Sequence, residues 1–249
     1  MSNLNTMQKQ NQIYDLFLKP GKHILILVDP DKFDKQEAAN SFEKLNSLID
    51  VVLVGGSLLS ETRTETVIEE LREMTSLPVI LFPGNAMQVT EKADAILFLQ
   101  LISGRNPEFL IGQHVHAAPL IARTKLEVIP TSYMLIDGGK RTSVEYISQS
   151  MPIPSDKTDI AVATALAGKF LGHKLIYLEA GSGALNAVPA VMVSEVSSKT
   201  NLPVIVGGGI RDEKTALELF SAGANAVVIG SLFENNPEAV VRIAQKIKK

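Results

Sequence analysis

The sequence contains no cysteine and no tryptophan, and aromatic residues make up only 5% of its 249 residues. The absence of cysteine excludes disulfide bonds, thiolate metal sites and cysteine nucleophiles. No uninterrupted apolar run approaches the roughly 18 residues that a membrane-spanning helix needs. The first dozen residues, Met1 to Gln12, lack the basic and then apolar plan of a secretory signal. We therefore expect a soluble cytoplasmic protein.

Neither sign of charge dominates, because 24 basic and 27 acidic residues leave a net charge of -3. A nucleic-acid-binding surface needs an excess of basic residues, so we expect no nucleic-acid partner. Apolar residues make up 45% of the chain, which is enough for a large core. The length suits one α/β barrel better than two ordinary domains. We therefore expect a single domain over residues 1–249.

Short β-type runs recur along the chain, and most are continuously apolar, as in parallel strands covered on both faces. Helical patterns lie between them, for example the apolar stripe of Val67, Ile68 and Leu71. Eight strands alternating with helices favour a (β/α)₈ barrel, the TIM-barrel architecture, over a doubly wound open sheet. The expected strands span residues 24–28, 51–54, 79–82, 95–99, 127–136, 175–178, 204–206 and 226–229.

An internal repeat also favours a barrel. Residues 76–80 read Ser-Leu-Pro-Val-Ile, and residues 201–205 read Asn-Leu-Pro-Val-Ile, about 125 residues later. At the same offset, Gly56-Ser57 corresponds to Gly181-Ser182. A repeat at about half the chain length predicts two related half-barrels.

Two regions break the regular spacing, residues 102–123 and residues 138–157. Connections this long in a compact domain are often lids or binding segments. The first region contains His114 and His116, which share a face only on a strand, whereas this segment has a helical pattern. We therefore expect no metal site at these histidines.

Three consecutive glycines, Gly207 to Gly209, follow the apolar run at 204–206. Without Cβ atoms, their amides can approach a phosphate closely at the start of the next helix. Gly230-Ser231 follows the next strand, and the loops after strands seven and eight of such barrels often bind phosphate. The alternative is a tight turn that needs positive φ. We favour phosphate binding.

Asp29 and Asp31 follow the first predicted strand, in the sequence Asp29-Pro30-Asp31-Lys32. A carboxylate together with phosphate oxygens suits Mg²⁺, which prefers hard oxygen ligands and keeps several waters. Ser57, after Gly55-Gly56, could add a hydroxyl to the same ion. The alternative for either acid is a helix cap.

Glu179 ends the apolar run Ile176, Tyr177 and Leu178. A lone acid at the end of a buried strand is unfavourable unless it is paired, bound or catalytic. Glu179 is therefore our candidate general base, and an ion pair is the alternative. The strand pattern leaves open whether Tyr177 faces the core or the substrate.

Together these residues resemble the geranylgeranylglyceryl phosphate synthase family of prenyltransferases. The resemblance covers nearly the whole chain, and its most specific motif is Tyr-Leu-Glu-Ala-Gly-Ser-Gly at 177–183. It implies a modified TIM barrel that joins sn-glycerol 1-phosphate to a polyprenyl diphosphate such as geranylgeranyl diphosphate, in ether-lipid synthesis. Bacterial heptaprenyl-using relatives carry a lysine where this chain has Leu27, so the chain resembles the larger, geranylgeranyl-using branch.

The resemblance also implies roles for residues. Asp29 and Ser57 would bind Mg²⁺, and Glu179, with Tyr177 beside it, would form the catalytic pair. The prenyl tail would need an apolar groove between the strand mouth and the two irregular regions. A homo-oligomer is expected, as is peripheral membrane contact during release of the lipid product. The residues implied to bind substrate are Tyr177, Leu178, Glu179, Ala180, Gly181, Ser182, Gly183, Gly208, Gly209, Gly230 and Ser231.

Two other functions stay open. One is another phosphate-binding barrel activity, such as a phosphosugar isomerase, which would need no polyprenyl groove. The other is a non-catalytic carrier of prenyl phosphates. The presence of both Asp29 and Glu179 favours an enzyme over a carrier, since binding alone requires no base.

Overall fold

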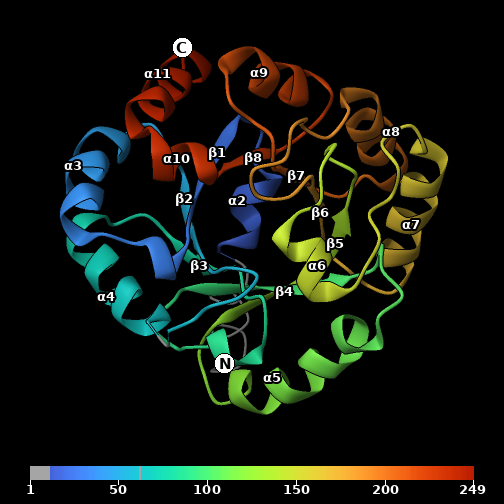
Figure 1. Ribbon diagram of the computed structural model, residues 1–249, viewed down its shortest axis with the longest axis horizontal. Helices are drawn as coiled ribbons and strands as arrows, with labels where there is room; N and C mark the ends of the chain where they lie inside the picture. The colour runs from blue at the N-terminus through green and yellow to red at the C-terminus, as the bar shows by residue number, and fades with distance from the viewer. Residues whose placement is uncertain (1–11, 62) are drawn as a thin grey trace, which may run out of the picture.

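The computed structural model describes residues 12–61 and 63–249. Eight parallel strands close in chain order into a barrel, with β1 hydrogen-bonded to both β2 and β8 (Figure 1). The predicted (β/α)₈ barrel is therefore confirmed, and the doubly wound sheet is excluded. The strands are β1 (His23–Val28), β2 (Val51–Val54), β3 (Val79–Leu81), β4 (Ala95–Leu101), β5 (Glu127–Leu135), β6 (Leu175–Glu179), β7 (Val204–Gly207) and β8 (Ala226–Ile229).

Helices surround the barrel and run between successive strands (Figure 1). The longer ones are α3 (Lys35–Leu45), α4 (Thr64–Met74), α5 (Gln113–Ile121), α7 (Thr158–Phe170), α8 (Ala190–Thr200), α9 (Glu213–Ser221) and α11 (Pro237–Ile247). Shorter pieces are α2 (Tyr14–Leu18), α6 (Ser143–Ser148), α10 (Ser231–Asn235), η1 (Pro30–Lys32), η2 (Ala86–Gln88) and η3 (Glu108–Gly112).

The connection from β3 to β4 contains only the three-residue η2 and no α-helix. A regular barrel covers every strand pair with a helix, so the β3–β4 connection lacks the α-helix that would normally lie there. The absence of a helix in this connection matters for the site, because the connection lines an apolar groove.

Two hydrophobic clusters hold the fold. One fills the barrel interior with side chains such as Leu25, Leu53 and Ile205. The other lies between strands and helices, with alternate residues such as Ile26 and Val206. Because most strands are buried on both faces, most are continuously apolar, which is the pattern that predicted them; β4 and β5 are the partly exposed exceptions.

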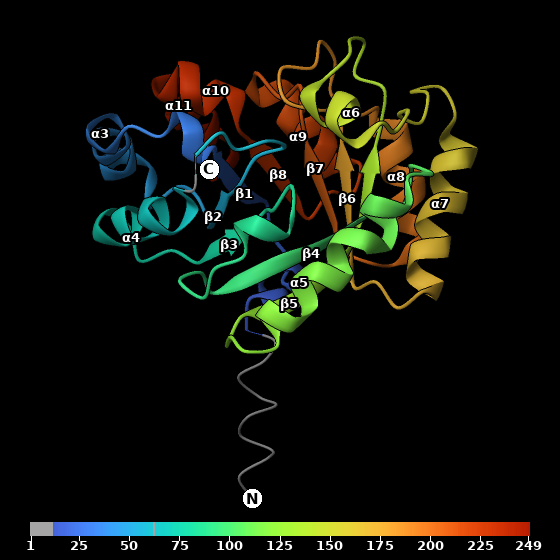
Figure 2. The ribbon, with the colours of Figure 1, turned by 60° about the horizontal axis from the view of Figure 1, so that its bottom comes forward.

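The amino-terminal end of the barrel is closed by α2. Phe17 is completely buried in the interior cluster, and the carboxylate of Glu127 accepts hydrogen bonds from the Ile13 and Tyr14 amides, both at 2.8 Å. Access to the interior is therefore from the opposite end, where the strands end and α6 and α10 lie (Figure 2).

The internal repeat corresponds to equivalent places in the two halves. Residues 76–80 lead into β3 and residues 201–205 into β7, while the two Gly-Ser pairs follow β2 and β6. The expectation for the first dozen residues falls almost wholly on residues 1–11, which lie outside the described part. Within that part, no helix combines the length and hydropathy needed to cross a bilayer.

Candidate active site

A cavity of about 1130 Å³ opens at the carboxyl ends of the strands. Its walls come mainly from the loops after β1, β2, β5, β6, β7 and β8, so parts of the chain far apart in sequence meet there. Most of the residues predicted from the sequence line it: Asp29, Ser57, Tyr177, Glu179, Ser182, Gly183, Gly208, Gly209, Gly230 and Ser231.

Three predicted substrate-binding residues have a different place. Leu178 and Ala180 point away from the cavity into the cluster between barrel and helices, where both are buried. Gly181 lies behind Glu179 and donates its amide to that carboxylate. Leu178 and Ala180 would therefore have to contact a substrate through main-chain atoms.

Glu179 ends β6 with its carboxyl group buried, at 6% exposure. Its Oε1 accepts a hydrogen bond of 2.6 Å from the Gly181 amide. Burial raises the pKa of Glu179 to about 7, although the Gly181 amide and the neighbouring Tyr177 hydroxyl act in the opposite direction. In the described structure no cation pairs with Glu179, so the ion-pair alternative is wrong. A carboxyl group that titrates near neutral pH suits a general base.

Tyr177 precedes Glu179 by two residues and shares its face of β6, toward the barrel interior. Its ring packs against Phe82 and Tyr133, with centroid distances of 5.1 Å and 5.5 Å. The Tyr177 hydroxyl lies beside the Glu179 carboxyl group but has no well-oriented hydrogen-bond partner. Burial, followed by the nearby Glu179, raises the pKa of Tyr177 well above its ordinary value. Tyr177 is therefore neutral, and it lies in the barrel interior beside the candidate base.

The glycine turn after β7 is packed directly against Glu179. Gly208 and Gly209 have φ values of +82° and +71°, which L-residues with side chains rarely adopt. A Cβ on Gly208 would lie 2.6 Å from Glu179 Oε1, and one on Gly209 would lie 2.4 Å from the Asn186 carbonyl oxygen. The tight-turn interpretation is thus correct, and the same turn also lines the cavity.

Two serine hydroxyls form a hydrogen bond between the loop after β6 and the loop after β8. Ser182 Oγ and Ser231 Oγ are 2.9 Å apart, and Ser231 begins α10 directly after Gly230. Arg211 lines the same side, but its guanidinium donates to the carbonyls of Ala184 and Leu185 at 2.5 Å and 2.9 Å. The serine hydroxyls and the glycine amides are therefore the candidate anion ligands here.

Asp29 both caps a turn and lines the cavity. Its Oδ1 accepts from the Asp31 amide at 3.1 Å, while Lys32 Nζ lies 3.3 Å from Oδ2 and 3.0 Å from Glu234 Oε2. The two interpretations of Asp29 are compatible, since one oxygen caps and the other faces Lys32. Asp31 is held by the Ser60 amide and hydroxyl, at 2.6 Å and 2.9 Å, and these contacts lower the pKa of Asp31.

The donors around Asp29 fit Mg²⁺ in chemical type. Asp29 supplies a carboxylate and Ser57 a hydroxyl, both hard oxygen ligands. Across residues 12–61 and 63–249, no three His, Cys, Asp or Glu side chains gather as a metal cluster. Two protein ligands are enough for an ion that keeps waters and binds substrate phosphates, and they would not hold one tightly alone.

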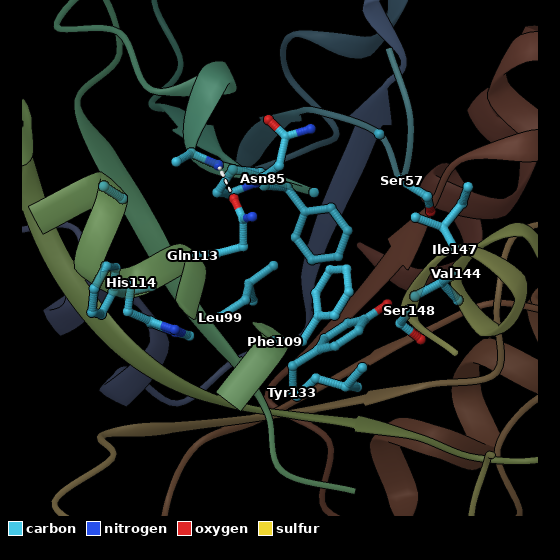
Figure 3. Close-up of a pocket in the computed structure, with 18 of the residues that line it drawn as sticks. Ser57, Asn85, Leu99, Phe109, Gln113, His114, Tyr133, Val144, Ile147 and Ser148 are labelled. Carbon is cyan, nitrogen blue, oxygen red and sulfur yellow. Dashed lines mark hydrogen bonds between the residues drawn. The ribbon is translucent and has the colours of Figure 1, made fainter. Parts of the chain in front are cut away.

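A second, apolar groove adjoins the cavity beside the β3–β4 connection and the helix α5, and Figure 3 shows side chains that line it. Ser57, Phe82 and Tyr133 line both spaces, so the polar cavity and the groove are continuous. The Ala86 amide donates to Gln113 Oε1 at 2.8 Å and so joins η2 to α5. The walls include residues from both irregular regions, as predicted: Phe109, Gln113, His114, Ala117, Val144, Ile147 and Ser148.

The prediction that His114 and His116 lie on a helix is confirmed. His114 and His116 lie on the helix α5, where residues two apart point in different directions. His114 packs edge-on against Phe98, with ring centroids 4.6 Å apart, and burial lowers its pKa. His114 is therefore neutral at pH 7, and it lines the groove.

Sequence reasoning missed several residues that line the cavity. Tyr133 was hidden within one long apolar run, and its inward direction follows only from the register of β5. Arg141, which is paired with Glu145 at 3.4 Å, lies in the connection after β5. The unusual length of that connection was the one signal that could have drawn attention to it.

The fold and the site together define a class of protein: a (β/α)₈-barrel enzyme in which the polar cavity at the strand ends opens into an apolar groove. The model of the PcrB family matches residues 18–248, so the chain belongs to that family. The predicted resemblance is therefore confirmed, and the chain is a prenyltransferase like its relatives.

Relatives in bacteria and archaea carry the same name. The geranylgeranylglyceryl phosphate synthase of Spirosoma linguale is 45% identical over 94% of this chain and 95% of its own length. That of Methanosphaera stadtmanae is 41% identical over 92% and 93%. The crystal structure of (S)-3-O-geranylgeranylglyceryl phosphate synthase from Thermoplasma acidophilum in complex with sn-glycerol-1-phosphate superposes with a TM-score of 0.85. It is 34% identical and covers 98% of this chain and 97% of that one.

Proposed function

We propose that this enzyme joins sn-glycerol 1-phosphate to geranylgeranyl diphosphate in a Mg²⁺-dependent reaction. The observation that carries the proposal is the position of Glu179, a buried carboxyl group with a pKa of about 7 beside a polar cavity that continues into an apolar groove. A phosphosugar isomerase would not need that groove. A carrier would not need a base.

The two substrates divide the cavity between them. Ser182, Ser231 and the glycine turn at 208–209 offer hydroxyls and amides to the glycerol phosphate. Ser57 and Asp29, on the other side, face the diphosphate. The prenyl tail follows the groove past Phe109 and Ala117, where apolar side chains exclude water.

In the reaction, Glu179 accepts the proton of the glycerol 3-hydroxyl as that oxygen bonds to the first prenyl carbon, and diphosphate leaves with the electrons of the broken bond. The Gly181 amide holds the carboxylate in place. Asp29 and Ser57 would hold Mg²⁺, and Lys32 would then pair with Glu234. When bound, the ion supplies positive charge to the leaving diphosphate. A cytoplasmic location, and membrane contact at product release, remain predictions.

A direct assay tests the proposal. Purified protein is incubated with Mg²⁺, radiolabelled sn-glycerol 1-phosphate and prenyl diphosphates of several lengths, and lipid is extracted into organic solvent. We expect label in the organic phase, most of it with geranylgeranyl diphosphate. Equal labelling from sn-glycerol 3-phosphate, or label that stays in water, would contradict the proposal.

A further inference from the structure

Hydrogen bonding between the main chains of β2 and β3 ends before the cavity is reached. Val54 pairs with Leu81, and the Phe82 amide then donates to the Val54 carbonyl oxygen at 2.8 Å. The loop that follows β2, residues 55–57, carries Ser57 to the wall that the cavity and the groove share. Main-chain groups in an enclosed place need hydrogen-bond partners, and past the end of the ladder the neighbouring strand does not supply them.

The side chain of Gln88 supplies these hydrogen bonds. Gln88 ends η2 and is buried, at 3% exposure. Its Nε2 donates to the Gly56 carbonyl oxygen at 2.9 Å, and its Oε1 accepts from the Gly56 amide at 3.4 Å. An amide side chain that binds both main-chain groups of one residue reproduces the contacts of a paired strand. The same Oε1 accepts from the Gly84 amide at 3.2 Å, so one side chain joins the loop after β2 to the connection after β3.

Gly56 connects Gln88 to the two candidate Mg²⁺ ligands, Asp29 and Ser57. A Cβ atom on Gly56 would lie 3.4 Å from Asp29 Oδ1, so the Gly56 backbone lies against that carboxyl group. Ser57 is the next residue in the chain, and a Cβ atom on Gly84 would come within 2.9 Å of the Ser57 carbonyl oxygen. Because these backbones are packed so closely, a movement of Gly56 would change where both ligands lie.

The other segment that Gln88 holds belongs to the apolar groove. Gly84, Asn85 and Ala86 line the groove. Among the described residues, those that line the cavity or the groove do not include Gln88 itself. Gln88 therefore ties the wall assigned to the prenyl tail to the loop assigned to the diphosphate, from behind both.

We propose that Gln88 is a positioning residue for the diphosphate end of the site. Its amide holds Gly56, and through Gly56 it sets Asp29 and Ser57 at a fixed place relative to the groove. The inference rests on the proposed function, because that function assigns Mg²⁺ to these two side chains. A diphosphate bound through a metal ion and a prenyl tail bound in a groove must fit at the same time, so the spacing of the two sites affects the reaction.

The glycerol phosphate end of the cavity should not depend on Gln88. Its hydroxyls, Ser182 and Ser231, follow β6 and β8 and are hydrogen-bonded to each other. In the closed barrel these strands are separated from β2 and β3 by β4 and β5 on one side and by β1 on the other. A variant of Gln88 that weakens one substrate and not the other therefore reveals positioning rather than a general loss of structure.

Gln88→Met tests the inference, because methionine is similarly long and flexible but forms none of the three hydrogen bonds. Binding of geranylgeranyl diphosphate is titrated by calorimetry at increasing Mg²⁺, without glycerol phosphate, so that no turnover occurs. The Mg²⁺ concentration that gives half-maximal tightening should rise about 10–100-fold, as when a group behind a metal ligand is removed. The affinity for sn-glycerol 1-phosphate, titrated separately, should stay as in the wild type.

Gln100→Met is the matched control. The Gln100 amide donates to the Leu110 carbonyl oxygen, and Gln100 too is outside the described walls of the cavity and the groove. This variant should keep the wild-type Mg²⁺ response, and circular dichroism checks that both variants fold. If Gln88→Met does not fold, Gln88→Glu gives the same comparison, because it keeps the side-chain shape and loses the donor to Gly56.

An unchanged Mg²⁺ response in Gln88→Met would overturn the inference. So would an equal shift in Gln100→Met, or a loss of glycerol phosphate binding as large as the loss of prenyl diphosphate binding. A wild type whose prenyl diphosphate binding does not respond to Mg²⁺ would instead contradict the proposed function, and the inference with it.

Discussion

The Gly208 backbone lies against the carboxyl group of Glu179, so closely that a Cβ atom on Gly208 would come within 2.6 Å of Oε1. The same Cβ would lie 2.6 Å from the Gly181 amide nitrogen, which donates to that oxygen. The glycine turn after β7 therefore does more than leave room for a phosphate. It also fixes the position of the candidate base.

Gly208→Ala should displace Glu179 and lower kcat/KM sharply, because the added methyl group meets both the carboxylate and its amide donor. The positive φ adds strain on the order of 1–3 kcal/mol. Gly172→Ala is the matched control, since Gly172 also has a positive φ, of +93°, but its Cβ would meet nothing within 4 Å and it does not line the cavity. Steady-state kinetics and thermal midpoints of both variants check this. Equal effects at the two glycines would contradict the proposed contact.

Glu179→Gln should stabilise the protein at alkaline pH. A buried carboxyl group with a pKa raised from 4.5 to about 7 binds its proton more tightly in the folded state, so wild-type stability falls as pH rises between these values. The variant lacks this loss and should gain on the order of 1–3 kcal/mol at pH 8 relative to pH 5. Urea unfolding at the two pH values measures the difference. A constant difference would mean that Glu179 titrates normally.

Asp29→Asn should weaken the Mg²⁺ response while keeping the fold, because asparagine also caps the turn at Asp31. We expect the apparent Mg²⁺ affinity to fall by more than the roughly 10–100-fold typical of losing an outer-shell partner. Asp31→Asn is the control, since its carboxylate is bound to Ser60. Activity across a Mg²⁺ titration distinguishes the two acids. A larger shift in Asp31→Asn would reverse their roles.

Ala117→Phe should shorten the apolar groove. Ala117 lines it from α5, so the larger ring would occupy space that we assign to the prenyl tail. KM for geranylgeranyl diphosphate should rise at least tenfold relative to geranyl diphosphate, by about the 1–3 kcal/mol expected of lost apolar contacts. Ala118→Phe, the neighbouring exposed position, should change neither value. Equal effects on both chain lengths would place the tail elsewhere.

The strand ends around the site could be predicted because most of the strands are continuously apolar, and β1, β2, β6 and β7 are followed by or end at an acidic residue or a glycine. Asp29, Ser57, Glu179 and Gly208 were therefore placed correctly at one mouth. The side to which the Tyr177 side chain points could not be predicted. Both faces of a buried strand are apolar, so the sequence does not show which residues face the barrel interior and which face the helices.

The apolar groove could be predicted only in outline. The two irregular regions indicated where it runs, and both contribute walls. Its depth depends on the missing helix between β3 and β4 and on the packing of Tyr133 with Phe82, at a centroid distance of 5.8 Å. Such contacts between distant residues arise from barrel closure, which no local pattern encodes.

The pH dependence of turnover, in wild type and Glu179→Gln, tests the central claim most directly. If Glu179 is the base, wild-type kcat/KM for sn-glycerol 1-phosphate rises with pH through an apparent pKa near 7 and then levels. The variant should turn over about 10²–10⁴-fold more slowly and lose this rise, with binding of the glycerol phosphate altered much less. A variant within a few-fold of wild type that keeps the same pH profile would contradict the account.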